Sequence, residues 1–402
     1  MTFKEFNFQP ELTEGLFYMG FDKATPIQEQ AIPLILDDKD LIACAQTGTG
    51  KTGAYLLPII NKITQAPGDY INTLIIVPTR ELAIQIDEQL QGFSYFAPVS
   101  ALAIFGGNNG SAFEQEKKAL TQGANIIIAT PGRLISHLNM GYVKTEHLKH
   151  LILDEADRML DMGFSEDLQK IIDYLPKHKQ TLMFSATMPP KIRTLAKKIL
   201  TNPAEINISI SKPAEGVTQA AYVVYDAQKM ELLKGILNEK EMSSVIIFSS
   251  KKDKVKELER ELKRAKFNAA SIHSDLEQNE RNDVLRNFKN KNLQVLVATD
   301  ILSRGIDIDS ISLVVNYDVP GDAEDYIHRV GRTARAETTG KAITFINDHD
   351  QHKFKKIEDL IGYEINKLAV PKKLGAQPEY APEKKEKRKP FNNKFAGKRT
   401  KR

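Results

Sequence analysis

The segment Leu151-Ile152-Leu153-Asp154-Glu155-Ala156-Asp157 joins a short apolar run directly to a cluster of carboxylates. Such a run predicts a buried strand that ends at the C-terminal edge of a parallel sheet, where open α/β folds bind ligands. At that edge, Asp154 suits a metal anchor and Glu155 a general base or water-positioning group, the pairing that hydrolyses a nucleoside triphosphate. An isolated acidic cluster is more often a solvated turn, so this hypothesis depends on a second motif.

The second motif is a glycine-rich loop that ends in Gly50-Lys51-Thr52. It follows an apolar run and should open a helix, so that backbone N–H groups surround phosphate oxygens. Lys51 would reach the β- and γ-phosphates, and the Thr52 hydroxyl would ligate Mg²⁺ together with Asp154. The alternative is a plain glycine-rich turn, and Ala45 replaces the first glycine of the strict pattern. The predicted nucleotide-binding loop comprises Ala45, Gln46, Thr47, Gly48, Thr49, Gly50, Lys51 and Thr52.

Composition is that of a soluble globular protein with two or three domains, since the chain has 402 residues, 41% of them hydrophobic and 27% charged. The single cysteine, Cys44, excludes an internal disulfide and a cysteine-based zinc site, and it is typical of a reducing cytosol. The N-terminus lacks the pattern of a signal peptide, and no apolar run approaches the length of a membrane span.

The charge is unevenly distributed along the chain. Residues 371–402 contain 12 Lys/Arg and 3 Asp/Glu, whereas the whole chain has a net charge of only +4. The segment is also rich in proline and poor in aliphatic residues, so we expect a disordered tail. Clustered cations favour binding to a polyanion such as nucleic acid, although a merely solubilising tail is the alternative.

Two successive series of buried strands alternate with helical stretches, which predicts two parallel-sheet α/β domains. The expected strands are 74–77, 126–129, 151–153 and 181–184 in the first series, and 245–248, 295–298 and 313–315 in the second. Proline, glycine and polar residues cluster between the series. The predicted organisation is a first domain at 1–205, a linker at 206–216, a second domain at 217–370 and a tail at 371–402.

The ordered motifs resemble those of the DEAD-box RNA helicases of superfamily 2, over about residues 3 to 365. The motifs of the first domain are Phe3, Gly20-Phe21, Thr25-Pro26-Ile27-Gln28, the loop at 45–52, Pro78-Thr79-Arg80-Glu81-Leu82, Gly106-Gly107, Thr130-Pro131-Gly132-Arg133, Asp154 to Asp157, and Ser185-Ala186-Thr187. Those of the second are Gln278 with Arg281, Ala298-Thr299-Asp300, Arg304-Gly305-Ile306-Asp307, and His328 to Arg335. The resemblance implies tandem RecA-like domains, and the motif series resembles that of the bacterial RhlE-like branch.

The resemblance also implies roles around ATP. Gln28 would pair with adenine, Phe3 would stack on it, and Asp307 would contact the ribose. Arg332 and Arg335 would act as arginine fingers from the second domain, and together with Lys51, Asp154 and Glu155 they form the catalytic set. The groups expected to couple the ATP state to RNA binding are Asp157, Ser185, Thr187, His328 and Arg329. Phe3 as a hydrophobic staple, and Ser185 and Thr187 as a helix cap, are the alternatives.

The implied RNA contacts are backbone contacts without sequence preference. They fall on Arg80, Gly107, Thr130, Arg133, Arg281 and Thr299. Any one of these residues could instead belong to an ordinary turn or cap. One departure from the family pattern is Ser274, which stands where many members have glycine.

We therefore expect a cytoplasmic, monomeric ATP-dependent RNA helicase that uses Mg²⁺ and locally unwinds short duplexes or remodels RNA–protein complexes. Domain closure would gate its RNA-stimulated hydrolysis. The alternatives are an RNA clamp in which unwinding is incidental, and a DNA-directed helicase. Ribosomal precursors and mRNA-turnover complexes are possible partners by resemblance; a membrane is not expected.

Overall fold

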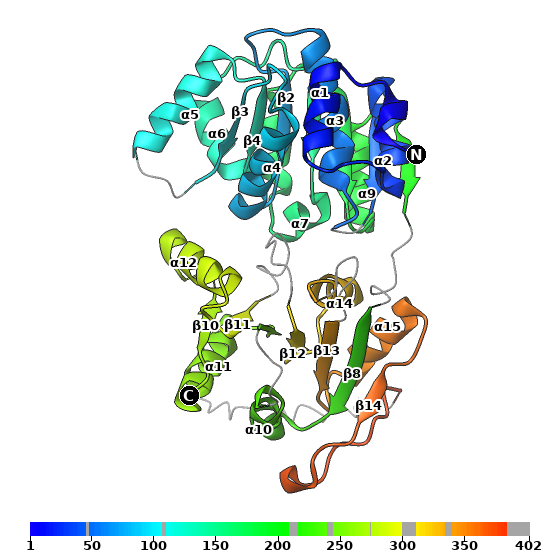
Figure 1. Ribbon diagram of the computed structural model, residues 1–402, viewed down its shortest axis with the longest axis vertical. Coiled ribbons are helices and arrows are strands. Elements are labelled where there is room, and N and C mark those ends of the chain that lie inside the picture. Colours follow the sequence, from blue (N-terminus) through cyan, green and yellow to red (C-terminus); the bar gives the residue numbers. More distant parts are fainter. Residues whose placement is uncertain are drawn as a thin grey trace, which may run out of the picture.

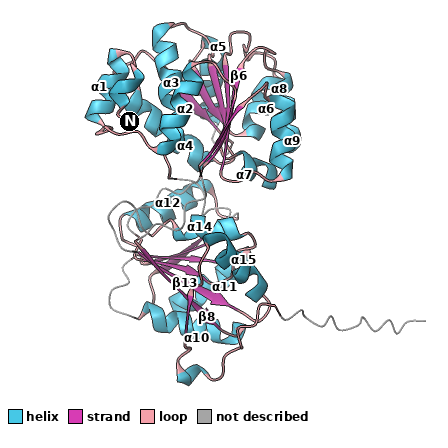
Figure 2. Cartoon of the chain, turned by 90° about the vertical axis from the view of Figure 1, so that its right-hand side faces the viewer, coloured by secondary structure: helices cyan, strands magenta, loops and turns pink. Residues whose placement is uncertain are grey.

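The computed structural model of the chain describes residues 1–45, 48–106, 110–208, 216–238, 244–273, 275–299, 311–333 and 340–383. Two parallel sheets, each flanked by helices on both faces, form two domains that lie one above the other in Figure 1 and Figure 2. Helices α7 of the first domain and α12 and α14 of the second lie on the sides that face the other domain. This confirms the predicted α/β class with two sheets.

The first sheet has the strand order β3-β4-β2-β5-β6-β1-β7, with parallel pairing throughout. Its strands are β1 (Leu41–Cys44), β2 (Thr73–Ile76), β3 (Ala101–Ile104), β4 (Ile126–Ala129), β5 (His150–Leu153), β6 (Gln180–Ser185) and β7 (Ala204–Asn207). Because β5 lies at the centre, the residues that follow it emerge in the middle of the sheet edge. Strand β7 continues two residues beyond the predicted boundary at residue 205, pairing with β1.

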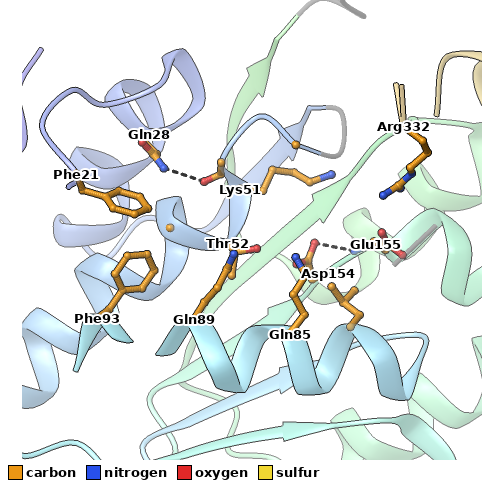
Figure 3. A pocket seen from close by; sticks show the side chains of 14 residues that line it. Phe21, Gln28, Lys51, Thr52, Gln85, Gln89, Phe93, Asp154, Glu155 and Arg332 are labelled. Atoms are coloured by element: carbon orange, nitrogen blue, oxygen red, sulfur yellow. Dashed lines mark hydrogen bonds between the residues drawn. The ribbon is translucent and has the colours of Figure 1, made fainter. Parts of the chain in front are cut away.

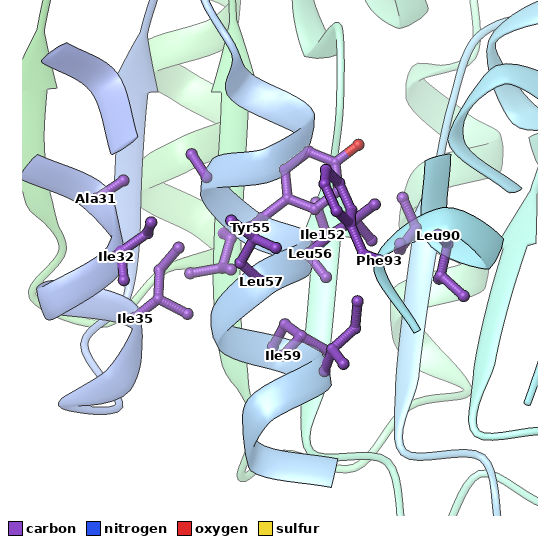
Figure 4. Packing of buried hydrophobic residues seen from close by; sticks show 14 of the residues in the cluster. Ala31, Ile32, Ile35, Tyr55, Leu56, Leu57, Ile59, Leu90, Phe93 and Ile152 are labelled. Atoms are coloured by element: carbon purple, nitrogen blue, oxygen red, sulfur yellow. The ribbon is translucent and has the colours of Figure 1, made fainter. Parts of the chain in front are cut away.

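Helices cover both faces of this sheet because successive strand residues point to opposite sides. Ile152 packs with α2, α3 and α4, whereas Leu151 and Leu153 pack on the other face with α6, α8 and α9. Figure 4 shows the first of these cores, built from α2, α3, α4 and Ile152. The helices are η1 (Phe3–Phe6), α1 (Pro10–Tyr18), α2 (Pro26–Leu36), α3 (Lys51–Gln65), α4 (Arg80–Phe93), α5 (Gly110–Gln122), α6 (Pro131–Asn139), α7 (Ala156–Asp161), α8 (Ser165–Asp173) and α9 (Pro190–Ile199).

The second sheet has the order β10-β11-β9-β12-β13-β8-β14, again parallel. Its strands are β8 (Val217–Val223), β9 (Val245–Phe248), β10 (Ala269–Ile272), β11 (Val295–Ala298), β12 (Leu313–Asn316), β13 (Gly340–Ile346) and β14 (Asn366–Leu368). Its helices are α10 (Asp226–Leu237), α11 (Lys252–Arg264), α12 (Gln278–Lys289), α14 (Ala323–Val330), α15 (Gln351–Ile361) and η2 (Lys372–Leu374). In chain order, the seven strands of this sheet take the same places as the seven strands of the first.

The first part of the predicted tail packs against the second domain. Gln228 Nε2 donates to the Leu374 carbonyl at 2.7 Å, and Tyr380 Oη donates to Glu358 Oε2 at 3.0 Å. Gln351 bonds the backbone at both Glu379 and Ala381. Residues 371–383 therefore belong to the folded second domain, and residues 384–402 lie outside the described part. No helix in the described ranges is both long and apolar enough to span a bilayer.

A substitution at Gly123 tests how closely this residue packs against the backbone of Asp69 in the first domain. Its φ is +91°, and a Cβ there would lie 2.2 Å from the Asp69 carbonyl oxygen. We expect Gly123→Ala to lower the stability of the first domain well beyond the roughly 1 kcal/mol that left-handed backbone costs a non-glycine residue. The measurement is urea unfolding followed by circular dichroism.

Gly141→Ala is the matched control, since Gly141 has φ +73° but no atom within 4 Å of the added Cβ. The excess loss in Gly123→Ala isolates the steric clash. Equal losses in the two variants would contradict the close approach of Gly123 to the Asp69 backbone.

Candidate active site

A cleft opens at the C-terminal edge of the first sheet and reaches the second domain (Figure 3). The glycine-rich loop (the P-loop, residues 45–52) and the residues after β5 line its floor, and helix α4 lines one side. From the second domain, Arg332 points into it. The cleft is lined by Phe21, Gln28, Gly48, Gly50, Lys51, Thr52, Gly53, Leu82, Gln85, Gln89, Phe93, Asp154, Glu155 and Arg332.

The glycine-rich loop leads directly into helix α3, as predicted. Gly48 and Gly50 have φ of +82° and +92°, conformations that glycine adopts without a Cβ penalty. Lys51 opens the helix, and its buried Nζ donates to the Ala45 carbonyl at 2.7 Å. The loop thus presents a cation and a helix N-terminus to the cleft, a combination that binds phosphate. Thr52 also lines the cleft, Thr49 lies in the same loop, and Gln46 and Thr47 lie outside the described residues.

Asp154 is buried, with 3% of its surface exposed, and both of its oxygens are bonded. Tyr55 Oη donates to Oδ2 at 2.9 Å, and the backbone N–H of Glu155 donates to Oδ1 at 2.9 Å. Burial raises the pKa of Asp154 above its usual value, and the positive charge of Lys51 opposes that rise. The carboxylate therefore lies in a site where a second cation would stabilise its charged form.

Glu155 follows with an uncommon backbone conformation, φ 50° and ψ 50°, at the N-cap of α7. Its side chain is held by Arg158, whose Nη1 lies 3.2 Å from Oε2 in a pair that is almost fully buried. A non-glycine residue in the left-handed region costs free energy that its surroundings must offset, and such residues gather at functional sites. Figure 3 shows Arg332 on the far side of the cleft, directed toward Glu155.

The third carboxylate of the acidic motif connects to β6 rather than to the cleft. Asp157 Oδ2 accepts hydrogen bonds from the Thr187 N–H at 2.9 Å and from Thr187 Oγ1 at 3.0 Å. Ser185 Oγ donates to the Thr187 carbonyl at 2.7 Å and accepts from the Asp157 N–H at 3.3 Å. The structure thus brings Asp157, Ser185 and Thr187 into one closed network.

Aromatic residues at the far end of the cleft differ from the sequence-based expectation. Phe21 and Phe93 line the cleft and meet edge to face, with ring centroids 5.2 Å apart. Phe3 is buried behind Phe21, at 6.0 Å, and does not line the cleft. Gln28 does line it, and its Nε2 donates to the Gly50 carbonyl at 3.1 Å while its Oε1 accepts from the Thr25 N–H at 2.9 Å. A flat, partly aromatic pocket therefore lies next to the phosphate loop.

Three residues in or next to the cleft were not predicted as site residues from the sequence: Gln85 and Gln89 line it, and Tyr55 bonds Asp154. Gln85 and Gln89 lie four residues apart on α4, a spacing that places them on one helical face. In the sequence, this pair of glutamines on one face of an amphipathic helix is the only pattern that could have indicated their place in the cleft. Tyr55 gave no signal, because a tyrosine among apolar residues of α3 is typical of a core position.

Within the second domain, Arg332 lines the cleft, while Arg335 and Asp307 lie outside the described residues. His328 and Arg329 are buried in α14. Arg329 Nη1 donates to Asn316 Oδ1 and to the Asp318 carbonyl, both at 3.0 Å, so it ties α14 to the end of β12.

One of the predicted RNA-binding arginines, Arg281, forms an ion pair across the domains with the residue that follows another, Arg80. Arg281 Nη1 lies 3.4 Å from Glu81 Oε1, with both side chains largely buried, and Arg80 is the preceding residue. Burial lowers the pKa of Arg80; the Glu81 carboxylate opposes this shift, and the charge of Arg281 adds to it. The two motifs, about 200 residues apart in sequence, thus form one cationic region around the Glu81 carboxylate.

The other predicted RNA contacts have partners of their own or lie at the ends of elements. Arg133 Nε donates to Glu116 Oε2 at 2.7 Å, and His137 Nε2 contacts the same oxygen at 2.9 Å. Thr130 is the N-cap of α6, and Thr299 directly follows β11. Gly107 and Ser274 lie outside the described residues.

Comparison with known proteins identifies the family. Residues 25–195 match the DEAD/DEAH box helicase model, and residues 228–337 match the helicase conserved C-terminal domain. The chain is 41% identical to the ATP-dependent RNA helicase CshA of Listeria monocytogenes, covering 92% of this chain and 70% of the relative. It is 39% identical to the CshA of Bacillus subtilis, covering 92% and 74%.

Solved structures agree. Dbp5 of S. cerevisiae, bound to RNA and ADP BeF3, aligns with a TM-score of 0.81 at 30% identity, covering 91% of this chain and 95% of that one. Mss116p, bound to ssRNA and AMP-PNP, aligns with a TM-score of 0.80 at 28% identity, covering 93% and 81%. A score of this size over both domains requires their relative placement to agree as well as their folds.

The chain belongs to the DEAD-box family of ATP-dependent RNA helicases. The two bacterial relatives are both CshA helicases, and placement on the RhlE-like branch stays a prediction.

Tyr55→Phe tests the electrostatics of Asp154. The hydroxyl of Tyr55 lowers the pKa of Asp154, so removing it should raise that pKa further. If the ionised carboxylate is the active form, the acid limb of the ATPase pH profile will move to higher pH. The profile of kcat against pH measures the shift.

Tyr326→Phe serves as the control, since Tyr326 is a buried tyrosine of the second domain whose hydroxyl donates to Gln219 instead. An acid limb that stays in place in Tyr55→Phe would show that Asp154 does not control this part of the profile.

Proposed function

We propose that this helicase uses Mg·ATP to separate short RNA duplexes locally or to remodel RNA–protein complexes, with hydrolysis gated by closure of its two domains. Arg332 of the second domain lines the same cleft as Lys51, Thr52, Asp154 and Glu155 of the first. The catalytic set is complete only where the two domains meet.

The residues present fit a Mg²⁺ ion. Thr52 and the buried Asp154 would hold it, because Mg²⁺ binds through one or two protein oxygens and completes its shell with water and phosphate oxygens. The bound ion would neutralise charge on the phosphates.

The opposite end of the cleft fits adenine. Phe21, held edge to face against Phe93, takes the stacking role that the family resemblance implied for Phe3. Gln28 carries both a donor and an acceptor and can pair with one edge of the base once its bonds to Gly50 and Thr25 are exchanged. The ribose contact of Asp307 stays a prediction.

Hydrolysis needs a positioned water and a stabilised γ-phosphate. Glu155, fixed by Arg158, would orient the attacking water, and Lys51 would bind the phosphates. Arg332, with Arg335 as the second predicted finger, would stabilise the charge that develops during transfer. Since Arg332 comes from the second domain, hydrolysis depends on how the domains are placed.

RNA would bind across the same two domains. Dbp5 and Mss116p, whose structures resemble this chain, are bound to RNA. Arg281 pairs with Glu81 across the domains, next to Arg80 in sequence, and an RNA phosphate could replace the Glu81 carboxylate as the partner of Arg281. Thr130, Arg133, Thr299 and Gly107 are further proposed contacts with the backbone, and a 2′-hydroxyl contact would select RNA over DNA.

The network of Asp157, Ser185 and Thr187 is the proposed link between the two sites. It joins α7, which begins after Glu155, to the residues that follow β6. A displacement of Glu155 would therefore reach the residues after β6 through these hydrogen bonds. We further propose a cytoplasmic monomer, with ribosomal precursors or mRNA-turnover complexes as partner classes.

Glu155→Gln tests the requirement for hydrolysis. The amide keeps the shape of the side chain but loses its charge, so ATPase should fall by at least about 100-fold, the scale of general acid–base and positioning effects. Binding of RNA in the presence of ATP should persist, while repeated strand separation fails. Phosphate release and a multiple-turnover duplex assay measure the two effects.

Glu166→Gln, at an exposed position of α8, is the control and should behave as the wild type. Repeated strand release by Glu155→Gln at the wild-type rate would exclude hydrolysis as the step that recycles the enzyme. Equal stimulation of the ATPase by DNA and RNA would exclude the RNA assignment.

Removal of residues 384–402 tests the basic tail. Truncation after Glu383 keeps the bonds of residues 371–383 to the second domain. We expect weaker RNA binding and a shallower dependence of the binding constant on salt, because fewer counterions are released. Basal ATPase should stay unchanged. Equal affinity of both forms at low salt would contradict a tethering role.

A further inference from the structure

The second sheet contains a counterpart of the ATP site. Strands β8, β13 and β12 take the places of β1, β6 and β5, because the two sheets have the same order when numbered along the chain. In the first domain, the loops after β1 and β5 lead to Lys51 and Asp154. A second cleft lies at the matching edge, lined by the start of α10 and by residues that follow β9, β12 and β13, with Lys229 and Asp318 among them.

In the second cleft, Lys229 and Asp318 form an ion pair, which Asp226 joins. Lys229, in the first turn of α10, is 1% exposed and places its Nζ 3.2 Å from Asp318 Oδ1 and 2.9 Å from Asp226 Oδ1. Burial acts to raise the pKa of Asp318, but Lys229 and hydrogen bonds outweigh it, so the pKa lies below its usual value. An ion pair thus lies at the sheet edge that corresponds to the one where the first domain has Lys51 and Asp154.

Asp318 has hydrogen-bond partners on several elements. Ser249 Oγ donates to its Oδ2 at 2.6 Å, and the Ser250 N–H donates to the same oxygen at 3.0 Å. Its backbone carbonyl accepts from Arg329 Nη1 at 3.0 Å. Asp318 therefore joins the start of α10, the end of β9 and the last turn of α14.

Helix α14 connects this cluster to the active site. Arg329, fully buried, bonds Asn316 and Asp318 and lies over the Phe248 ring at 5.3 Å. The backbone N–H of Arg332 donates to the Arg329 carbonyl at 3.2 Å. The next residue, Thr333, donates its hydroxyl to the Ile311 carbonyl at 2.6 Å. The backbone of Arg332 is therefore fixed on both sides, and the fixed point on its helix side is Arg329.

We propose that the Lys229–Asp318 pair is a positioning element for Arg332. In the second domain, the counterpart of the nucleotide site anchors the helix that presents the arginine to the first domain's ATP cleft. The pair acts through Arg329 and the turn after α14 and does not itself touch ATP. This inference rests on the proposed role of Arg332 in hydrolysis.

The test uses Asp318→Asn and Arg332→Ala in the full chain, alone and combined. Because misplacing a catalytic group by about 1 Å costs on the order of 100-fold in rate, we expect Asp318→Asn to lower the RNA-stimulated kcat by about 10- to 100-fold. The affinity for a fluorescent ATP analogue and the KM for ATP should stay within about twofold of the wild type, since the P-loop is untouched.

The double variant separates positioning from general damage. If Asp318 acts through Arg332, then Asp318→Asn will cause no further loss of kcat in the Arg332→Ala background. An additive loss, or a raised KM in the single variant, would overturn the inference. If Arg332→Ala alone leaves kcat unchanged, the proposed function itself fails, which distinguishes the two outcomes.

Two further variants guard against unfolding. Ser249→Ala removes the 2.6 Å bond to Asp318 and leaves the ion pair in place, so it should show a smaller loss of kcat with the same dependence on Arg332. Glu259→Gln removes a partly buried carboxylate that bonds Lys263 and Ser271 in the same domain. It should leave kcat unchanged. If Asp318→Asn does not fold, Ser249→Ala decides: a wild-type kcat in that variant would overturn the proposal.

Discussion

The arrangement of the first domain's cleft depends on the unfavourable burial of one carboxylate, that of Asp154. Asp154 lies at the centre of the sheet edge, and an ionised carboxylate without partners is very unfavourable in such a place. Tyr55 Oη and the Glu155 N–H supply hydrogen bonds, and Lys51 supplies the opposing charge. Lys51 and Tyr55 lie one turn apart on α3, so a single helix serves both the phosphates and the carboxylate. The apolar packing of α3 between α2 and α4 consequently holds the site together.

The site is nevertheless incomplete within that domain. Arg332 enters from the second domain, and the Glu81–Arg281 pair connects the same two domains on the side of the predicted RNA contacts. A change in domain placement therefore alters the proposed ATP cleft and the predicted RNA-binding region together. Coupling between two ligands requires such an element with differential contacts in its states. The element proposed here is the relative position of the two sheets.

The two domains show how one architecture carries different chemistry. Both sheets have the same strand order, and both have a lysine and an aspartate at corresponding edges. In the first domain the lysine and carboxylate face a cleft that fits phosphate and a metal ion, whereas in the second Lys229 is paired with both Asp318 and Asp226. Function thus follows from the site and its electrostatics rather than from the fold.

The sequence by itself determined the two parallel-sheet domains, the phosphate loop and the roles suggested for Asp154 and Glu155. Short apolar runs and contiguous motifs are local signals, and β4, β9 and β11 match their predicted ranges. Only the tertiary structure decided that Phe21 rather than Phe3 lines the cleft, that Tyr55 bonds Asp154, that Glu116 holds Arg133, and that residues 371–383 belong to the second domain. These are pairings between distant segments. A sequence pattern records which residues are apolar or charged, but the partner of a buried polar group depends on which strand edges the fold brings together.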